Sequence, residues 1–172
     1  MSTRFSRAGR WLFGSHPQSL QETATTVLKY GCLAYVVRTY GVGATFCVGP
    51  SMLPTFNSFG DIVLFEHVSA YTNRIQAGDV VIARSPQNPG NLVCKRVLGL
   101  EGDFVKVAAS TYLGPARTVQ VPAGHVWLQG DNALNSTDSR SYGPVPYALI
   151  EGRAFLKVWP ATQASWVKRQ LS

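Results

Sequence analysis

The sequence predicts a mainly β domain, an antiparallel sheet system or partial barrel, behind one N-terminal helix. The 172 residues include 16 glycines and 10 prolines, which favour frequent turns over a helical bundle. Hydrophobic residues make up 45% and charged residues 15%, so bulk disorder is excluded. Gly-Asp pairs punctuate the chain, at Gly60-Asp61, Gly78-Asp79, Gly102-Asp103 and Gly130-Asp131. The first three run directly into the apolar stretches IVLF, VVIA and FVKVA, which are rich in strand-forming residues.

The N-terminal segment, residues 1–19, is basic. Arg4, Arg7 and Arg10 recur every three residues, and no acidic residue precedes Glu22. This composition is typical of a mitochondrial targeting segment, and equally of a frayed terminus that happens to be basic. Both interpretations stay open from this stretch alone.

Residues 20–43 are expected to form a transmembrane or membrane-associated helix. A spanning helix needs about 20 largely apolar residues. Here the charge-free apolar stretch between Lys29 and Arg38 covers only Tyr30–Val37. Hydropathy therefore leaves three arrangements open: a span, a helix in the membrane surface, and a helix packed on the domain.

The β region is expected over residues 44–160, after Gly41 and Gly43 end the helix. Strands are predicted at Ala44–Val48, 62–65, 80–83, Leu92–Leu98, 104–108, Thr118–Val121, Val126–Leu128 and Arg153–Val158. Short strands at this spacing indicate an antiparallel sheet or partial barrel. Residues 161–172 are expected to be a C-terminal tail.

Composition excludes several functional classes. Three cysteines without a C-x-x-C pair argue against a disulfide-dense scaffold or a zinc knuckle. Three histidines without an H-E-x-x-H motif argue against the metalloenzymes most easily recognised from sequence, and no metal or cofactor is expected. The net charge is +7, but no run of Lys and Arg interleaves with aromatic residues after residue 60, so no nucleic-acid partner is expected.

Ser51 lies on a constrained connection. Pro50 precedes it and Pro54 follows, and proline fixes φ and disfavours helix in the residue before it. Met52 and Leu53 are available to pack beneath. A serine held this way can present its hydroxyl in a fixed direction.

A serine nucleophile needs a base. His67 and His125 are candidates, with Asp61, Asp79 or Asp131 to orient them, but none has a distinctive sequence context.

Lysine is the other option. If Leu92–Leu98 is a strand, Val93, Lys95 and Val97 share one face. Burial between two valines disfavours the ammonium and lowers the lysine pKa, which suits a base. Cys94, on the opposite face, is expected to be a packing residue.

The segment Gly130–Pro146 is long, polar and loop-like. Asp138 and Arg140 are spaced to pair, and Ser136 is placed to bind a neutral lysine.

Three motifs resemble the ordered boxes of the type I signal peptidase family, the Ser-Lys membrane proteases. They are GPSMLPT (49–55), CKRVLGLEGD (94–103) and GDNALNSTDSRSYGPVP (130–146). The likeness is greatest to mitochondrial members and covers roughly residues 25–160. It implies a signal-peptidase-like catalytic domain with a membrane-associated helix ahead of it.

The resemblance also implies a role for each matched residue. Ser51 matches the nucleophile, whose backbone N–H is an oxyanion donor, and Lys95 matches the general base. Ser136 matches the serine that orients the lysine. Asp138 and Arg140 match the pair that rigidifies the site.

Two positions depart from bacterial relatives. Some of them carry a second oxyanion donor, a serine, where Gly49 stands here, and many carry an acidic residue at the position of Leu134.

Substrates and partners are likewise implied only by the resemblance. It implies presequence-bearing proteins bound as an added β-strand, a homologous second subunit, and a catalytic domain on the intermembrane-space side of the mitochondrial inner membrane. A non-catalytic peptide-binding subunit and a self-cleaving Ser-Lys regulator are the alternatives.

Overall fold

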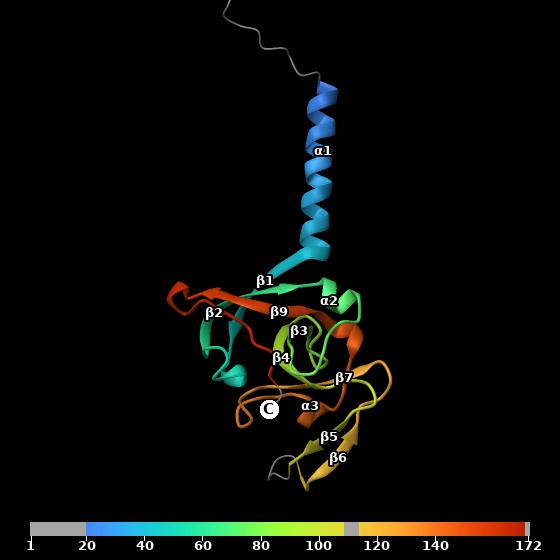
Figure 1. Ribbon diagram of the computed structural model, residues 1–172, viewed down its shortest axis with the longest axis vertical. Helices are drawn as coiled ribbons and strands as arrows, with labels where there is room; N and C mark the ends of the chain where they lie inside the picture. Colours follow the sequence, from blue (N-terminus) through green and yellow to red (C-terminus); the bar gives the residue numbers. More distant parts are fainter. Residues whose placement is uncertain (1–19, 109–113, 171–172) are drawn as a thin grey trace, which may run out of the picture. The chain divides into compact units, whose positions relative to one another are not determined.

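The computed structural model describes residues 20–108 and 114–170, and the chain divides into two compact units between Tyr35 and Val36 (Figure 1). The predicted basic targeting segment, residues 1–19, lies outside the described residues. The helix α1 spans Leu20–Val36, and a π-helical turn continues it through Val37–Gly41. The helix therefore ends at Gly41, as expected, but the predicted range 20–43 is two residues too long, because Val42 and Gly43 already pair with β2. Within residues 20–108 and 114–170, no helix has the length and apolarity needed to cross a membrane.

The second unit is built on an antiparallel sheet, which confirms the mainly β prediction. Its strand order is β1-β2-β9-β3-β4-β7-β8, with β10 paired to β9, and β5 pairs with β6 in a separate ribbon. The strands are β1 (Val42–Val48), β2 (Phe59–Glu66), β3 (Val80–Arg84), β4 (Leu92–Gly99), β5 (Phe104–Val107), β6 (Arg117–Gln120), β7 (His125–Gln129), β8 (Val145–Pro146), β9 (Ile150–Trp159) and β10 (Ser165–Trp166). Two short helices, α2 (Val68–Tyr71) and α3 (Ser139–Tyr142), lie in the connections.

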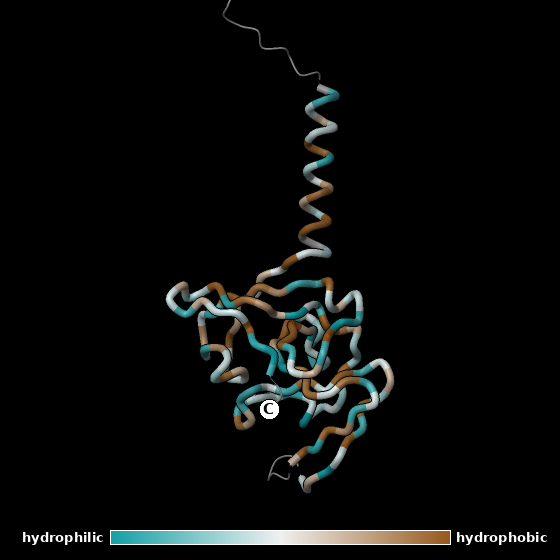
Figure 2. Tube along the Cα trace, in the orientation of Figure 1, coloured by the Kyte–Doolittle hydropathy of each residue, from teal (hydrophilic) through white to brown (hydrophobic). Residues whose placement is uncertain are grey.

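The sheet is curved and its middle strand is buried on both faces. Along β3, Val80 and Ile82 belong to one hydrophobic cluster, and Val81 and Ala83 belong to the other. Figure 2 shows the corresponding concentration of hydrophobic residues at the centre of the body. Irregularities interrupt the β1–β2, β2–β9, β3–β9 and β4–β7 registers. Such bulges increase local twist and bend a strand, so they help the sheet to curl.

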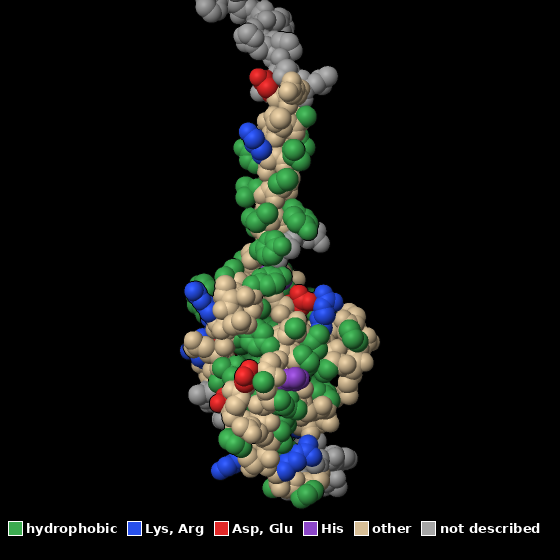
Figure 3. All heavy atoms as spheres, turned by 90° about the vertical axis from the view of Figure 1, so that its right-hand side faces the viewer, with side chains coloured by type: hydrophobic (Ala, Val, Ile, Leu, Met, Phe, Trp, Pro, Cys, Tyr) green, Lys and Arg blue, Asp and Glu red, His purple; other side chains and the backbone are tan. Residues whose placement is uncertain are grey.

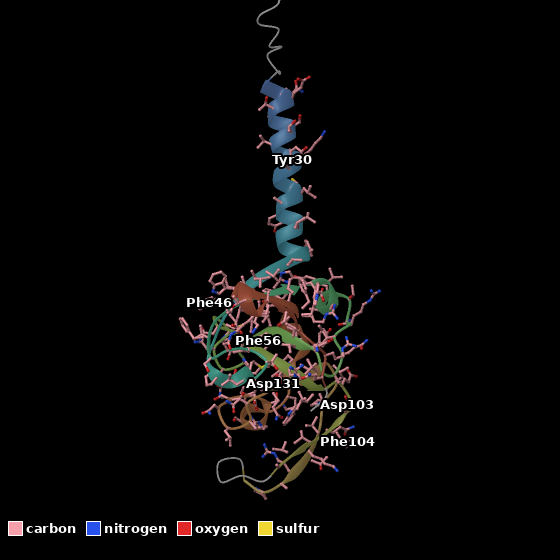
Figure 4. The ribbon with its side chains drawn as sticks, turned by 60° about the vertical axis from the view of Figure 1, so that its left-hand side comes forward. Tyr30, Phe46, Phe56, Asp103, Phe104 and Asp131 are labelled. Carbon is pink, nitrogen blue, oxygen red and sulfur yellow. The ribbon has the colours of Figure 1, made fainter. Side chains whose placement is uncertain are left out.

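One hydrophobic cluster supports the serine connection from below. Its buried members are Met52, Phe56, Val63, Phe65, Val80, Ile82 and Ala154. Met52 is 3% exposed, which agrees with its predicted place beneath Ser51. Phe56 points into the body, whereas Phe46 on β1 lies at the outer surface (Figure 4). The serine therefore stands on a packed base rather than on a free loop.

The described part of the C-terminal tail is bound to the sheet. Trp166 on β10 lies opposite Leu156 of β9, and Val167 N–H donates to Phe155 O. Further along, Arg169 pairs with Asp79 at 2.8 Å.

A buried acid anchors the turn that follows the serine connection. Asp61 is fully buried and accepts hydrogen bonds from the backbone and side-chain amides of Asn57, each at 2.8 Å. Lys157 Nζ on β9 lies 3.5 Å from the same carboxylate. The contacts hold the end of the serine connection against two strands.

We expect Asp61→Ala to lower the free energy of unfolding by about 3–5 kcal/mol, because it leaves the Lys157 ammonium buried without its partner. Urea denaturation measures the change. Asp103→Ala, at an exposed turn carboxylate that accepts from Leu100 N–H, is the control and should cost about 1 kcal/mol. Equal losses in the two variants would contradict the assigned role of Asp61.

Candidate active site

Lys95 lies in the middle of β4 and is buried. It stands opposite Val81 in the β3–β4 register, and its residue exposure is 4%. Val93 is half-buried and Val97 is fully buried on the same face, as the alternation predicts. Burial lowers the pKa of Lys95 below its ordinary value, and the charge of Asp138 opposes that shift only in part.

A chain of hydrogen bonds begins at the Lys95 amine. Lys95 Nζ donates to Ser136 Oγ at 3.0 Å, and Ser136 Oγ donates to Asp138 Oδ2 at 2.7 Å. Arg140 grips both carboxylate oxygens of Asp138, through Nε at 2.9 Å and Nη2 at 2.8 Å. The structure thus brings four of the five predicted site residues into one connected set.

Asp138 is the fixed point of this set. It is fully buried and also accepts from Gly130 N–H at 2.9 Å. Burial alone would raise the pKa of its carboxyl, but the hydrogen bonds from Arg140, Gly130 and Ser136 outweigh burial and lower the pKa. Asp138 is therefore a stable anion that orients Ser136.

Ser51, the fifth residue, sits in a 3-10 turn formed by Pro50–Met52. Its carbonyl accepts from Asn132 N–H at 3.0 Å, and Asn132 Nδ2 donates to Pro50 O at 3.1 Å. Gly130 permits this approach, because a Cβ there would lie 2.5 Å from Ser51 O. The loop that carries Ser136 therefore also holds the serine turn. The sequence analysis did not predict this role of Asn132, although the residue directly follows the Gly130-Asp131 pair.

The other face of β4 ties the same two loops together. Arg96 is 2% exposed, and its Nε and Nη2 bind the two oxygens of Asp131, each at 2.7 Å. Thr55 donates its hydroxyl to Asp131, and Arg96 Nη1 donates to Lys168 O at 3.1 Å in the tail. This network was also missed, because the sequence gives no spacing signal for contacts between residues 35 to 76 positions apart.

Ser51 and Lys95 line one cavity of about 200 Å³. Its other walls come from the end of β1, Thr45–Val48, and from the beginning of β4, Leu92–Cys94. The cavity thus lies between two strands, with the hydroxyl-bearing and amine-bearing residues on its surface.

The two candidate histidines are engaged elsewhere. His67 Nδ1 makes a 2.7 Å hydrogen bond with Glu151 O, and His125 Nδ1 makes one of 2.8 Å with Ala123 O. Neither histidine is among the residues that line the cavity of Ser51. The carboxylates proposed to orient them bind other groups, Asp61 with Lys157, Asp79 with Arg169 and Asp131 with Arg96. Neither candidate histidine therefore forms a Ser-His-Asp arrangement with Ser51.

The structure accounts for the two positions, Gly49 and Leu134, at which the chain departs from bacterial relatives. Gly49 has a φ of 110°, which favours glycine over any other residue. Leu134 is 93% exposed and so contributes nothing to the polar chain around Asp138. Across residues 20–108 and 114–170, no cluster of three His, Cys, Asp or Glu side chains is arranged to hold a metal.

Comparisons with known proteins agree with the geometry. The family model described as signal peptidase, peptidase S26, matches residues 20–113 and 108–159. Mitochondrial ATP-independent inner membrane protease subunit 1a of Arabidopsis thaliana is 52% identical over 81% of this chain and 83% of its own length. Mitochondrial inner membrane protease subunit 1 of Mus musculus is 48% identical over 82% of this chain and 84% of its own. Mitochondrial inner membrane protease subunit 2 of Danio rerio is 39% identical over 80% and 71%.

We expect Asp138→Asn to lower the free energy of unfolding by about 3 kcal/mol or more near neutral pH, since it breaks a buried ion pair with Arg140. Because folding lowers the pKa of Asp138, its contribution is present above the unfolded value of about 3.9 and is lost as pH falls through the folded value. Urea denaturation across the acid range should therefore show the variant and the native chain converging at low pH.

The matched control is Glu151→Gln, which removes the more exposed ion pair with Arg84. It should cost about 1 kcal/mol or less. A stability difference for Asp138→Asn that stays constant down to the lowest pH would contradict the assigned anion.

Proposed function

The chain belongs to the peptidase S26 family of signal peptidases, and from that membership we propose that it is a serine endopeptidase that uses Ser51 as nucleophile and Lys95 as general base. The observation that carries the proposal is the buried Lys95 amine, aimed by Ser136 within the cavity that Ser51 lines. A lysine with a lowered pKa is neutral in a larger fraction of molecules near physiological pH than a solvated lysine. Only the neutral amine accepts a proton.

The reaction proceeds in two steps. Neutral Lys95 takes the hydroxyl proton of Ser51 as the oxygen attacks the scissile carbonyl, and the proton then passes to the departing amine. An acyl-enzyme on Ser51 remains. Lys95 next takes a proton from the water that attacks the ester, and it returns this proton to the Ser51 oxygen as the carboxylic acid product leaves and ionises in solvent. Ser136 keeps the amine pointed at the reacting atoms, and Asp138 keeps Ser136 in place.

The oxyanion is stabilised by the backbone N–H of Ser51. A side-chain donor two residues earlier would require a residue other than glycine at position 49, where φ is 110°. A non-glycine residue in that conformation costs about 1–3 kcal/mol, so this backbone favours the departure from bacterial relatives.

The substrate binds as an extended strand between β1 and β4. In the described sheet β1 pairs only with β2, and β4 pairs with β7 only from Arg96 onward. The free edge of β1 and the first half of β4 both line the cavity. A peptide added there pairs through its backbone and presents alternate side chains to the cavity.

The relatives named subunits 1 and 2 of a mitochondrial inner membrane protease support a two-subunit enzyme at that membrane. We assign to this chain presequence-bearing substrates, a homologous second subunit and a catalytic unit on the intermembrane-space side of the inner membrane. The helix α1 is the membrane-associated element of the proposal. Hydrophobic side chains cover much of its surface, including Val27, Leu28 and Tyr30, each at least 66% exposed (Figure 3).

Ser51→Ala and Lys95→Ala test the proposal directly. We expect Ser51→Ala to abolish cleavage of a presequence reporter, and Lys95→Ala to slow it by about a hundredfold to ten-thousandfold, the usual contribution of a general base. Lys95→Arg should be equally slow, because a guanidinium stays protonated. The assay uses the full chain in membranes with its second subunit.

Two exposed positions provide matched controls, Ser165→Ala on β10 and Lys106→Ala on β5, and both should keep native rates. Full activity in either Ser51→Ala or Lys95→Ala would reject the mechanism. Peptide binding without cleavage in the native chain would favour the non-catalytic alternative, and self-cleavage of the purified chain would favour the regulator.

The pH dependence of cleavage reports the state of Lys95. Because the amine must be neutral, the rate should rise with pH through the pKa of Lys95 and then level off. Burial places that pKa below the ordinary 10.5, so the midpoint of the rise should lie below that pH. A single-turnover pH–rate profile measures it, and a rise centred on the value of a solvated lysine would contradict the assignment.

A further inference from the structure

We propose that Cys47 and Cys94 form a redox-active dithiol, which a small organic disulfide such as oxidised glutathione converts into a protein disulfide that closes the substrate cavity. The closing effect rests on the proposed function. The dithiol itself rests on the arrangement of β1 and β4.

The curvature of the sheet brings the two cysteines together. In the sheet order, β1 and β4 are four steps apart. In a flat sheet with strands about 4.8 Å apart, four steps separate them by roughly 19 Å. Yet Cys47 and Cys94 line the same cavity and pack against the same buried cluster. Their side chains are also hydrogen-bonded to each other.

The two thiols have different characters. The hydrogen bond from Cys94 lowers the pKa of Cys47, while the same bond and burial raise the pKa of Cys94 well above its ordinary value. Cys47 is the better thiolate and is partly exposed on the cavity wall. Cys94 packs against the buried cluster, as predicted from its strand position, and it also lines the cavity together with Cys47. The pair therefore has an attacking and a resolving member.

The exchange is balanced. The Cys47 thiolate attacks one sulfur of the small disulfide, forms a mixed disulfide and releases one small thiolate. The Cys94 sulfur then attacks Cys47, forms the Cys47–Cys94 bond and releases the second small thiol. The protein loses two electrons and two protons, and the small disulfide gains both. A small thiol in excess reverses the reaction.

Strand geometry makes the disulfide and a bound substrate mutually exclusive. Two strands that flank an inserted strand lie about 9.6 Å apart, twice the normal strand spacing. A disulfide holds its two Cα atoms within about 6.8 Å. The oxidised dithiol therefore draws β1 and β4 too close for a peptide strand between them. Oxidation should stop cleavage without any change at Ser51 or Lys95.

The experiment uses the full chain in membranes with its second subunit. The probe is oxidised glutathione, followed by dithiothreitol. Two quantities are measured: the cleavage rate of the presequence reporter, and the cysteine pairing by mass spectrometry of unreduced peptides. For Cys47→Ala and for Cys94→Ala, the cleavage rate of the oxidised variant is compared with that of the same variant in its reduced form. The control is Cys32→Ala, at an exposed position on α1 in the other unit.

After oxidation we expect the native chain and Cys32→Ala to yield a disulfide-linked Cys47–Cys94 peptide and to cleave the reporter at least tenfold more slowly. Dithiothreitol should restore both the free thiols and the cleavage rate. Cys47→Ala should keep its own reduced rate after oxidation. Cys94→Ala should carry glutathione on Cys47, form no Cys47–Cys94 peptide, and regain its reduced rate with dithiothreitol. A native chain in which both thiols stay free under oxidant would overturn the dithiol. A disulfide that forms without slowing cleavage would overturn the closure. Absence of cleavage in the reduced native chain would instead count against the proposed function, since pairing is read independently of activity.

Discussion

The burial of one amine is the constraint on which the site depends. Lys95 lies in the middle of β4 and is 4% exposed, and its pKa falls because the interior disfavours an ammonium. Burying an amine without a hydrogen-bond partner would destabilise the fold, and the hydrogen bond to Ser136 offsets that penalty. Ser136 can accept from the amine because its own proton is committed to Asp138. Arg140 thus keeps Asp138 ionised, Asp138 orients Ser136, and Ser136 positions the Lys95 amine, whose pKa is lowered.

The same constraint explains the architecture around the serine. The turn at Pro50–Met52 is held from below by the packing of Met52 and from the side by Asn132. Asn132 and Ser136 belong to one loop, so the loop that aims the base also holds the nucleophile. On the reverse face of β4, Arg96 joins that loop to the tail. Positions far apart in the chain become one rigid site through a few charged groups with low exposure.

The local sequence pattern predicted most of the strands, but it predicted only some of the contacts between residues far apart in the chain. Apolar runs after Gly-Asp pairs marked β2, β3 and β5, because turn chemistry and strand propensity act over a few residues. The alternation on β4 predicted a buried Lys95 for the same reason. The roles of Ser51 and Ser136 came from a family resemblance. The Arg96–Asp131 pair, Asn132 and the facing cysteines escaped prediction, because they depend on how a bulged sheet curls, and no spacing in the sequence encodes that.

The most direct test of the account is the titration of the Lys95 amine itself, followed by ¹⁵N NMR of the side-chain nitrogens in lysine-labelled protein. The account predicts that one resonance, absent in Lys95→Arg, titrates below the ordinary lysine pKa of 10.5. In Asp138→Asn that titration should move lower still, since the nearby negative charge that favours the ammonium is gone. A Lys95 resonance that titrates at the ordinary lysine pKa would contradict the account, because a solvated amine of ordinary basicity cannot serve as the base at this site.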